Sequence, residues 1–184
     1  SAPKSVSVAA LAAGDDRVTA AHDRAVATAL AHIERHGATA RDKGLERAGQ
    51  AHSTDNLLIA TFRHTSSREG QPQLHTHSVV MNATRDEAGN WRSIESKSIL
   101  RLQKEAGELY RLELARELRA AGYQLETGRD KNGQFTFEVA NIDKDLMRHW
   151  SARSEQVEKA LEARGKDRDS ATAAEKQTAA LDSR

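Results

Sequence analysis

Cysteine is absent from this sequence, and its absence limits the chemistry that the chain can support. With no thiol among its 184 residues, the chain can form neither disulfide bonds nor thiolate metal sites. Any metal ion that it binds must therefore be held by nitrogen and oxygen ligands. A chain without cysteine also suits the reducing environment of the cytoplasm, without proving that location.

Aromatic residues and long apolar runs are scarce as well. Phe, Trp and Tyr make up 4% of the residues, which argues against a base-stacking surface built from many rings. No apolar stretch approaches the roughly 18 residues that a membrane span needs, and the first residues have no signal-peptide pattern. The net charge of +1 neither supports nor excludes binding to DNA.

The order of apolar and turn residues predicts an α+β fold within a single domain over residues 1–184. Apolar spacings of three and four predict helices, and the expected ranges are 1–14 with Ser1 as N-cap, 15–36, 98–121, 143–150, 154–164 and 170–181. Segments in which apolar and polar residues alternate predict strands that pair as hairpins. The strand expected over 57–64 pairs with one over 74–85, the turn 86–90 leads on into a strand over 91–94, and 123–127 pairs with 134–139. This order indicates an antiparallel β-sheet covered by helices, with residues 165–184 as a helical tail.

Two further expectations concern the segments around the first hairpin. Val79, Val80 and Met81 follow one another directly, and such a run is typical of a central strand covered on both faces. Residues 37–53 are polar and interrupted by glycine, which predicts a loop.

Three histidines carry the strongest chemical signal in the chain. His75 and His77 are two residues apart, so on a strand they share one face. His64 ends the preceding apolar segment, and Gly70 and Pro72 lie between it and His75, where the chain can turn back. Pairing of the two strands would bring all three imidazoles together. Such a triad predicts a site for one divalent metal ion with coordination positions left open.

The type of metal is narrowed only partly by these ligands. An all-nitrogen triad suits Zn, Mn, Ni, Co or Cu better than Ca, and Mg also remains a candidate. A metal held this way can ionise a bound water or polarise a phosphoryl oxygen.

Two basic residues are candidates for contact with a phosphate. Arg68 lies in the predicted turn between the histidine segments, where a guanidinium can hold a phosphate through two hydrogen bonds. Lys4 lies at the start of a predicted helix, a position that attracts anions, although simple capping explains it as well. Arg63 falls on the strand face opposite His64 and is expected to be a structural or solvated charge.

The remaining histidines and both tyrosines are expected to be ordinary core or surface residues. His32 and His36 are four residues apart on a predicted helix, with no obvious acidic partner. Tyr110 lies within an apolar helical stripe, and Tyr123 opens a strand. No further signal marks the other histidines, which are His22, His52 and His149.

Four segments resemble the MobF-type (TraI/TrwC-like) conjugative relaxases of the HUH endonuclease superfamily. The similar segments are Ser-Ala-Pro-Lys-Ser-Val-Ser at the start, Ala-His-Asp-Arg-Ala-Val from Ala21, Phe-Arg-His-Thr-Ser-Ser-Arg with Pro-Gln-Leu-His-Thr-His from Phe62 to His77, and Leu-Glu-Leu-Ala-Arg-Glu-Leu from Leu112. The resemblance runs nearly end to end, and the histidine block is its most specific part. It implies a palm-like antiparallel sheet and places the divalent metal on His64, His75 and His77.

The resemblance also implies an activity. Such proteins nick one strand of DNA at a plasmid origin of transfer by transesterification, and a tyrosine becomes linked to the 5′ end. Relaxosome accessory proteins, a type IV coupling protein and a cytoplasmic, bacterial location are expected with it. In this family the nucleophilic tyrosines and an assisting aspartate precede the segment that begins at Ser1. We therefore expect a relaxase domain fragment with the metal site but with no catalytic residue of its own.

Two other readings of the residues stay open at this stage. A phosphodiesterase or nuclease with a metal-bound water as nucleophile would need no tyrosine. A module that binds single-stranded DNA around a structural metal would usually need a fourth protein ligand, and no fourth histidine or cysteine is obvious.

Overall fold

The computed structural model describes residues 1–41, 51–167 and 170–182, which fold into helices and short antiparallel ribbons. The elements in chain order are α1 Lys4–Leu11, α2 Asp16–Gly37, β1 Thr39–Arg41, β2 Ala51–Ser53, β3 Ile59–Ser66, β4 Pro72–Val80, β5 Thr84–Arg85, β6 Trp91–Arg92, α3 Ser96–Arg101, α4 Gln103–Ala120, β7 Leu125–Arg129, β8 Phe135–Val139, α5 Lys144–His149, α6 Ala152–Glu162 and α7 Ala173–Asp182. This composition confirms the predicted α+β class. No helix in these ranges is both long and apolar enough to cross a membrane.

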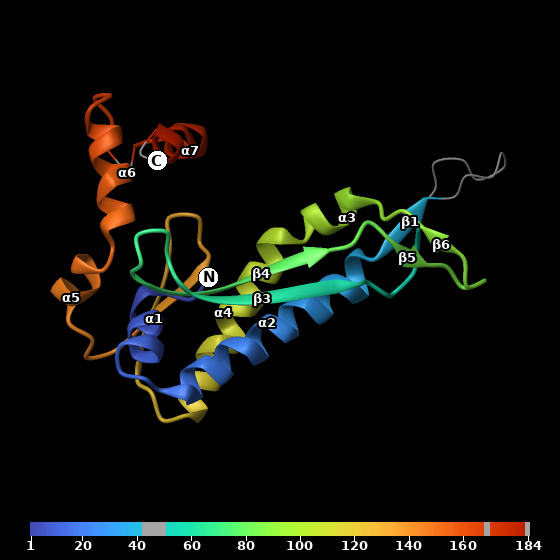
Figure 1. The fold of residues 1–184 in the computed structure, drawn as a ribbon, viewed down its shortest axis with the longest axis horizontal. Helices are drawn as coiled ribbons and strands as arrows, with labels where there is room; N and C mark the ends of the chain where they lie inside the picture. Colours follow the sequence, from blue (N-terminus) through green and yellow to red (C-terminus); the bar gives the residue numbers. More distant parts are fainter. Residues whose placement is uncertain (42–50, 168–169, 183–184) are drawn as a thin grey trace.

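Every strand of the described chain pairs antiparallel with its neighbour along the sequence, as β1–β2, β3–β4, β5–β6 and β7–β8. Figure 1 shows the longest ribbon, β3–β4, running beside α2 and α4, with the short ribbons β1 and β5–β6 at one end and α5, α6 and α7 at the other. The three predicted hairpins are confirmed, because β3–β4, β5–β6 and β7–β8 fall on their segments.

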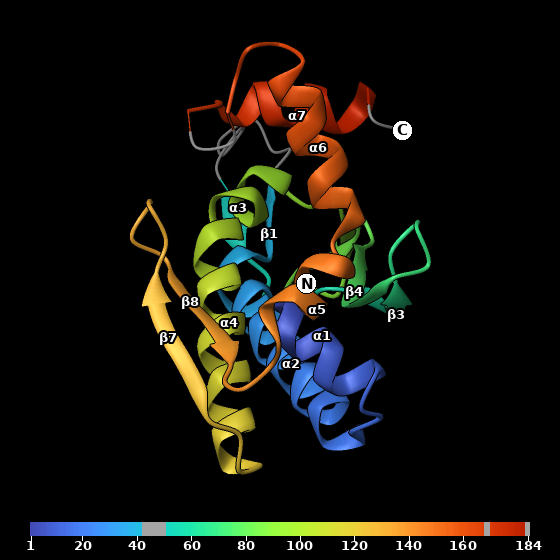
Figure 2. The same cartoon turned by 90° about the vertical axis from the view of Figure 1, so that its left-hand side faces the viewer.

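The core lies between α1, α2, α4 and the inner faces of the β3–β4 and β7–β8 ribbons. Figure 2 shows α2 and α4 side by side, with β7 and β8 flanking α4. α2 contributes a stripe of small residues and α4 contributes larger ones, so that the two helices approach closely. The buried members are Val18, Ala21, Ala25 and Ala29 on α2 and Tyr110, Leu114, Ala115 and Leu118 on α4.

α1 joins the two ribbons through buried serines. The Ser7 hydroxyl accepts a hydrogen bond from the Leu74 backbone N–H of β4 at 3.0 Å, and the Ser5 hydroxyl accepts one from the Val139 N–H of β8 at 2.7 Å. Both serines are almost fully buried. Because an unpaired strand N–H is costly inside a protein, these side chains replace the missing neighbour strand on each ribbon. The polar residues of α1 are therefore part of the core.

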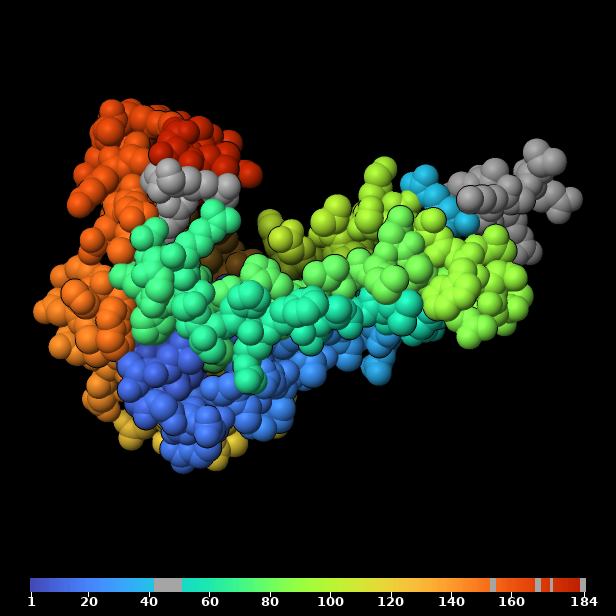
Figure 3. Space-filling model, in the orientation of Figure 1, coloured from blue at the N-terminus to red at the C-terminus, as the bar shows by residue number. Residues whose placement is uncertain are grey.

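The prediction that the second histidine strand is covered on both faces is wrong. Leu74 is fully buried, but Phe62, Val79 and Met81 are 54%, 55% and 55% exposed. Among the described residues, β4 pairs with β3 alone, and helices pack on one face of this ribbon only. Figure 3 shows the teal and green atoms of the ribbon uncovered on the face in view.

Several predicted boundaries also differ from the structure. The helix expected over 98–121 is two helices, α3 and α4, which meet at Leu102. The strand expected over 74–85 ends at Val80 and resumes as β5. α1 begins after Pro3 and has no side-chain cap, so Ser1 is not its N-cap. The flanks of the predicted loop 37–53 pair as β1 and β2, and residues 42–50 of that loop lie outside the described part.

His22 makes the stability of the fold depend on pH. Burial lowers the pKa of its imidazole to about 4, from an ordinary value of 6.5. Between these values the unfolded chain binds more protons than the folded chain, so the free energy of unfolding falls as the pH drops from 6.5 to 4. The expected loss is on the order of 3 kcal/mol. Denaturant unfolding at a series of pH values measures it.

His22→Gln removes the titrating group and should flatten the dependence on pH over this range. His149 is exposed on the surface, so His149→Gln serves as the matched control and should keep the steeper dependence. An unchanged slope in His22→Gln would show that other groups cause the loss at low pH.

Candidate metal centre

Three histidines meet on the open face of the β3–β4 ribbon. His64 lies directly opposite His75 in the register, and His77 lies opposite Phe62, which places His77 diagonally across from His64. The ring centroids are 5.3 Å apart for His64 and His75, 4.9 Å for His64 and His77, and 5.0 Å for His75 and His77. The ribbon thus brings together all three histidines that the spacing singled out.

The spacing of the imidazole nitrogens fits one metal ion. One ring nitrogen from each histidine lies within 4.8 Å of the other two. Metal–nitrogen bonds of about 2.0–2.1 Å require a closer approach than this upper bound, and rotation of the exposed side chains of His64 and His77 can provide it. Within residues 1–41, 51–167 and 170–182, this is the one group of three or more histidine and acidic side chains with such a spacing.

The backbone orients one ring of the triad for coordination. The Nδ1 atom of His75 lies 2.9 Å from the Gln73 carbonyl oxygen. A carbonyl only accepts hydrogen bonds, so Nδ1 carries the proton and the Nε2 atom of a neutral ring keeps its lone pair. Metal-binding histidines commonly have this type of support for the nitrogen that does not coordinate.

A bulge follows His64 on β3. The register shifts between His64 and Ser66, and the turn that follows closes with a hydrogen bond from the Ser67 N–H to the Gln71 carbonyl at 2.8 Å. Gly70 in this turn has a φ of 70°, a conformation that glycine adopts without strain. Bulges of this type re-aim neighbouring side chains, and this one lies directly beside the triad.

The two predicted phosphate contacts have different surroundings. Arg68 is exposed in the β3–β4 turn and has no hydrogen bond or ion pair to the described residues. The Lys4 amine donates hydrogen bonds to the Pro72 carbonyl at 3.0 Å and to the Trp150 carbonyl, and burial lowers the pKa of Lys4. Two of its three protons therefore hold the ribbon and α5 together. The roles of Arg68 and Lys4 toward phosphate stay predictions.

Both tyrosines have hydroxyl groups that already serve the fold. The Tyr110 hydroxyl lies 2.7 Å from the His22 Nδ1 atom in the core, and Tyr123 donates to the Asp15 carboxylate at 2.6 Å. Burial is the main cause that raises the pKa of each phenol, which disfavours the phenolate that a nucleophile needs. The structure also places Arg63 on the inner face, paired with Asp23, as a structural charge.

Two interactions were missed by reading the sequence. His22 is a fully buried member of the α2 stripe, and its Nε2 atom lies 2.8 Å from the hydroxyl of Thr76, the residue between His75 and His77. The sign of this burial in the sequence is that His22 lies four residues after the apolar Val18, on the same face of the helix. His32 does have an acidic partner, because Glu105 of α4 lies 3.0 Å from its Nε2 atom. Nothing in the sequence indicates which residue of a distant helix will face His32.

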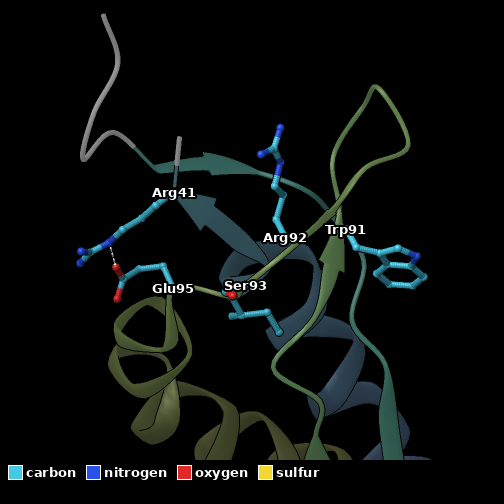
Figure 4. A pocket seen from close by; sticks show the side chains of 6 residues that line it. Arg41, Trp91, Arg92, Ser93 and Glu95 are labelled. Carbon is cyan, nitrogen blue, oxygen red and sulfur yellow. Dashed lines mark ion pairs between the residues drawn. The ribbon is translucent and has the colours of Figure 1, made fainter. Parts of the chain in front are cut away.

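A hollow in the surface lies at the end of the molecule that β1 and β6 form, away from the triad. It has a volume of about 440 Å³ and is lined by residues of β1, β6 and the segment that follows β6, namely Arg41, Trp91, Arg92, Ser93, Ile94 and Glu95. Figure 4 shows the ion pair between Arg41 and Glu95 at its rim. Arg92 pairs with Asp86 at 2.8 Å. Because both arginines are neutralised, this hollow offers weaker chemistry than the triad.

Comparison with protein-family models matches residues 1–184 to the TrwC relaxase family. The multifunctional conjugation protein TraI of Escherichia coli strain K12 is 33% identical over 195 residues, which cover 100% of this chain and 10% of TraI. A second Escherichia coli TraI matches to the same extent. The chain therefore spans about a tenth of the length of these curated relatives.

Solved structures of the conjugative relaxase TrwC share the fold of the whole chain. TrwC complexed with a 27-mer DNA comprising the recognition hairpin and the cleavage site is 43% identical with a TM-score of 0.92, and the match covers 100% of this chain and 63% of that chain. Copper-bound TrwC in complex with oriT DNA is 43% identical with a TM-score of 0.91, and the match covers 100% and 60% of the two chains.

Removal of one triad histidine should abolish tight metal binding. For His77→Ala we expect the affinity for Mn²⁺, Zn²⁺ or Co²⁺ to fall by more than about 100-fold, because a lost ligand costs more than a lost supporting contact. Calorimetric titration measures this change, and circular dichroism should show an intact fold because His77 is exposed. His149→Ala, at an exposed histidine outside the triad, is the matched control. Equal stoichiometry and affinity in His77→Ala would rule out the triad.

Proposed function

The chain belongs to the TrwC relaxase family, and on that premise we propose that it carries the metal centre of an enzyme that nicks DNA at a plasmid origin of transfer. The observation that carries the proposal is the convergence of His64, His75 and His77 on an open strand face. A divalent ion bound there would supply Lewis-acid polarisation of the scissile phosphate. The identity of the ion is left open by three imidazole ligands.

Single-stranded DNA at the origin of transfer is the proposed substrate. The related TrwC structures contain oriT DNA, in metal-bound and metal-free forms, which supports a DNA substrate for this chain. The open face of the ribbon also suits a long polymer, since the described residues leave Phe62, Val79 and Met81 beside the triad exposed. We propose that Arg68, at the turn next to the triad, binds a phosphate of this strand, and that Lys4 is a weaker candidate for such a contact.

The proposed reaction is a transesterification with a tyrosine nucleophile. The tyrosine hydroxyl gives up its proton as its oxygen bonds to the scissile phosphorus, the bond from phosphorus to the 3′ oxygen breaks, and the departing 3′ oxygen takes up a proton. The DNA stays linked to the protein at its 5′ end. Because Tyr110 and Tyr123 use their hydroxyls within the fold, we assign the nucleophile and an assisting aspartate to the part of the protein that precedes Ser1.

The same proposal includes the domain organisation, the cellular location and the partners of the whole protein. Residues 1–184 would be one relaxase domain fragment, and within the tail predicted over 165–184 the described helix is α7, Ala173–Asp182. The whole protein would work in the bacterial cytoplasm with relaxosome accessory proteins and a type IV coupling protein. These assignments rest on membership of the family.

The reaction can be tested with labelled single-stranded origin DNA and Mn²⁺ on a denaturing gel. We expect this chain alone to bind the DNA without cleavage or a covalent adduct. A longer form that includes the preceding sequence should give a covalent adduct that depends on the metal. His77→Ala in the longer form should lose the adduct, and His149→Ala should keep it.

Two outcomes of that gel would contradict the proposed reaction. Metal-dependent cleavage by this chain without an adduct would indicate a metal-bound water as nucleophile. DNA binding without any adduct from the longer form would leave a DNA-binding module with a structural metal.

Arg68→Ala should weaken binding of single-stranded DNA and lower its dependence on salt. Loss of one phosphate contact is expected to reduce the slope of log affinity against log salt by about 0.7. The slope can be measured by fluorescence anisotropy between about 50 and 200 mM salt. Arg116 is exposed but paired with Glu113 and Glu117, so Arg116→Ala is the matched control. An unchanged slope in Arg68→Ala would make Arg68 an ordinary surface charge.

A further inference from the structure

His22 is a buried polar residue that the proposed function does not use. It projects from α2 into the core, its side chain is fully buried, and both of its ring nitrogens have partners. The Nδ1 atom lies 2.7 Å from the Tyr110 hydroxyl of α4, and the Nε2 atom lies 2.8 Å from the Thr76 hydroxyl of β4. One imidazole therefore connects the two central helices to a single residue of the ligand strand.

Thr76 is the residue between two proposed metal ligands, His75 and His77. Side chains alternate along a strand, so Thr76 points to the inner face while both histidines point to the open face. One peptide bond joins Thr76 to His75, and the next joins it to His77. A bond that fixes the Thr76 side chain therefore limits rotation of the strand segment from which both ligands project.

The neighbouring residue on the same inner face is held in a similar way. The Leu74 N–H donates to the Ser7 hydroxyl at 3.0 Å, and the Leu74 carbonyl accepts from the Ala2 N–H at 2.9 Å. Along β4, Leu74 and Thr76 are hydrogen-bonded to residues behind the ribbon. His75 and His77 between and beyond them point to the open face, where His75 is half-buried and His77 is exposed.

A fully apolar residue at position 22 could fill the same space without directing the strand. A hydrogen-bonded imidazole fixes both distance and angle, and buried polar networks cost desolvation free energy unless every member is satisfied. The T-shaped arrangement of the His22 and Tyr110 rings, with centroids 5.6 Å apart, further restrains the imidazole. This arrangement favours a role in geometry over a role in packing alone.

We propose that His22 is a positioning residue for the metal centre, which holds β4 through Thr76 so that His75 and His77 project toward one ion. The inference rests on the proposed metal site, and it concerns the support of the ligands from behind the strand. His22 itself does not touch the metal or the DNA. Tyr110 completes the support by holding the far side of the imidazole.

The test compares two substitutions at Thr76 by titration with Co²⁺ alone. Thr76→Val removes the hydroxyl with little change in volume, and we expect the affinity for Co²⁺ to fall by about tenfold. Thr76→Ser keeps the hydroxyl and should bind Co²⁺ within about twofold of the unchanged chain. A groove between α2 and the inner face of the β3–β4 ribbon is lined by both Thr76 and Thr61 of β3. Thr61→Val is therefore the matched control, and it should bind Co²⁺ as tightly as the unchanged chain. Among these three variants, the Co²⁺ absorption spectrum should change in Thr76→Val and stay the same in Thr76→Ser and Thr61→Val.

The double variant tests whether His22 acts through Thr76. His22→Gln should also weaken Co²⁺ binding by about tenfold, and the combination with Thr76→Val should be no weaker than either single variant, because both remove the same bond. Additive losses would show that the two residues act separately and would overturn the inference.

Two further outcomes would also overturn it, and they are distinguishable. If Thr76→Val binds Co²⁺ as tightly as the unchanged chain while its melting temperature falls, the network stabilises the fold only, and the proposed metal centre stands. If the unchanged chain does not bind Co²⁺ at all, the metal centre fails and the inference fails with it.

Discussion

The docking of β4 onto the helices through buried hydrogen bonds is the constraint on which the rest of this structure depends. A two-stranded ribbon alone is marginally stable in water, and β3–β4 has no further strand beside it among the described residues. Ser7 and Ala2 bind the backbone of Leu74, and His22 binds Thr76. These bonds fix which face of the ribbon is buried, and a slip of one residue would reverse the two faces.

The position of the proposed metal site follows from which face of the β3–β4 ribbon is buried. With Leu74 and Thr76 directed inward, His75 and His77 must project outward, and antiparallel pairing places His64 opposite His75. The same geometry leaves Phe62, Val79 and Met81 uncovered. An apolar, accessible strand face beside a cluster of imidazoles is unusual for a surface, and it agrees with a site that receives a large substrate.

Local patterns predicted most of the fold. The α2 helix, the hairpins and the α+β class follow from periodicity and turn residues, and the meeting of the three histidines follows from strand alternation. The predictions that failed concern residues whose burial or hydrogen-bond partners depend on segments far away in the sequence. The covered strand was inferred from consecutive apolar residues at 79–81, but burial depends on what packs against them. The sequence does not distinguish His22 and His32 from ordinary polar residues, because their partners Thr76 and Glu105 lie far away in the sequence.

We propose that the buried anchor behind β4, formed by His22 and Thr76, presents three histidines to one metal ion. Anomalous diffraction at the cobalt edge from crystals of the chain grown with Co²⁺ tests it most directly. We expect a single strong peak among His64, His75 and His77, with the Nε2 atom of His75 toward the ion and its Nδ1 atom still bonded to the Gln73 carbonyl. A peak elsewhere, for example beside His32 and His36, or the absence of any peak at the triad, would show that the three histidines do not hold the metal.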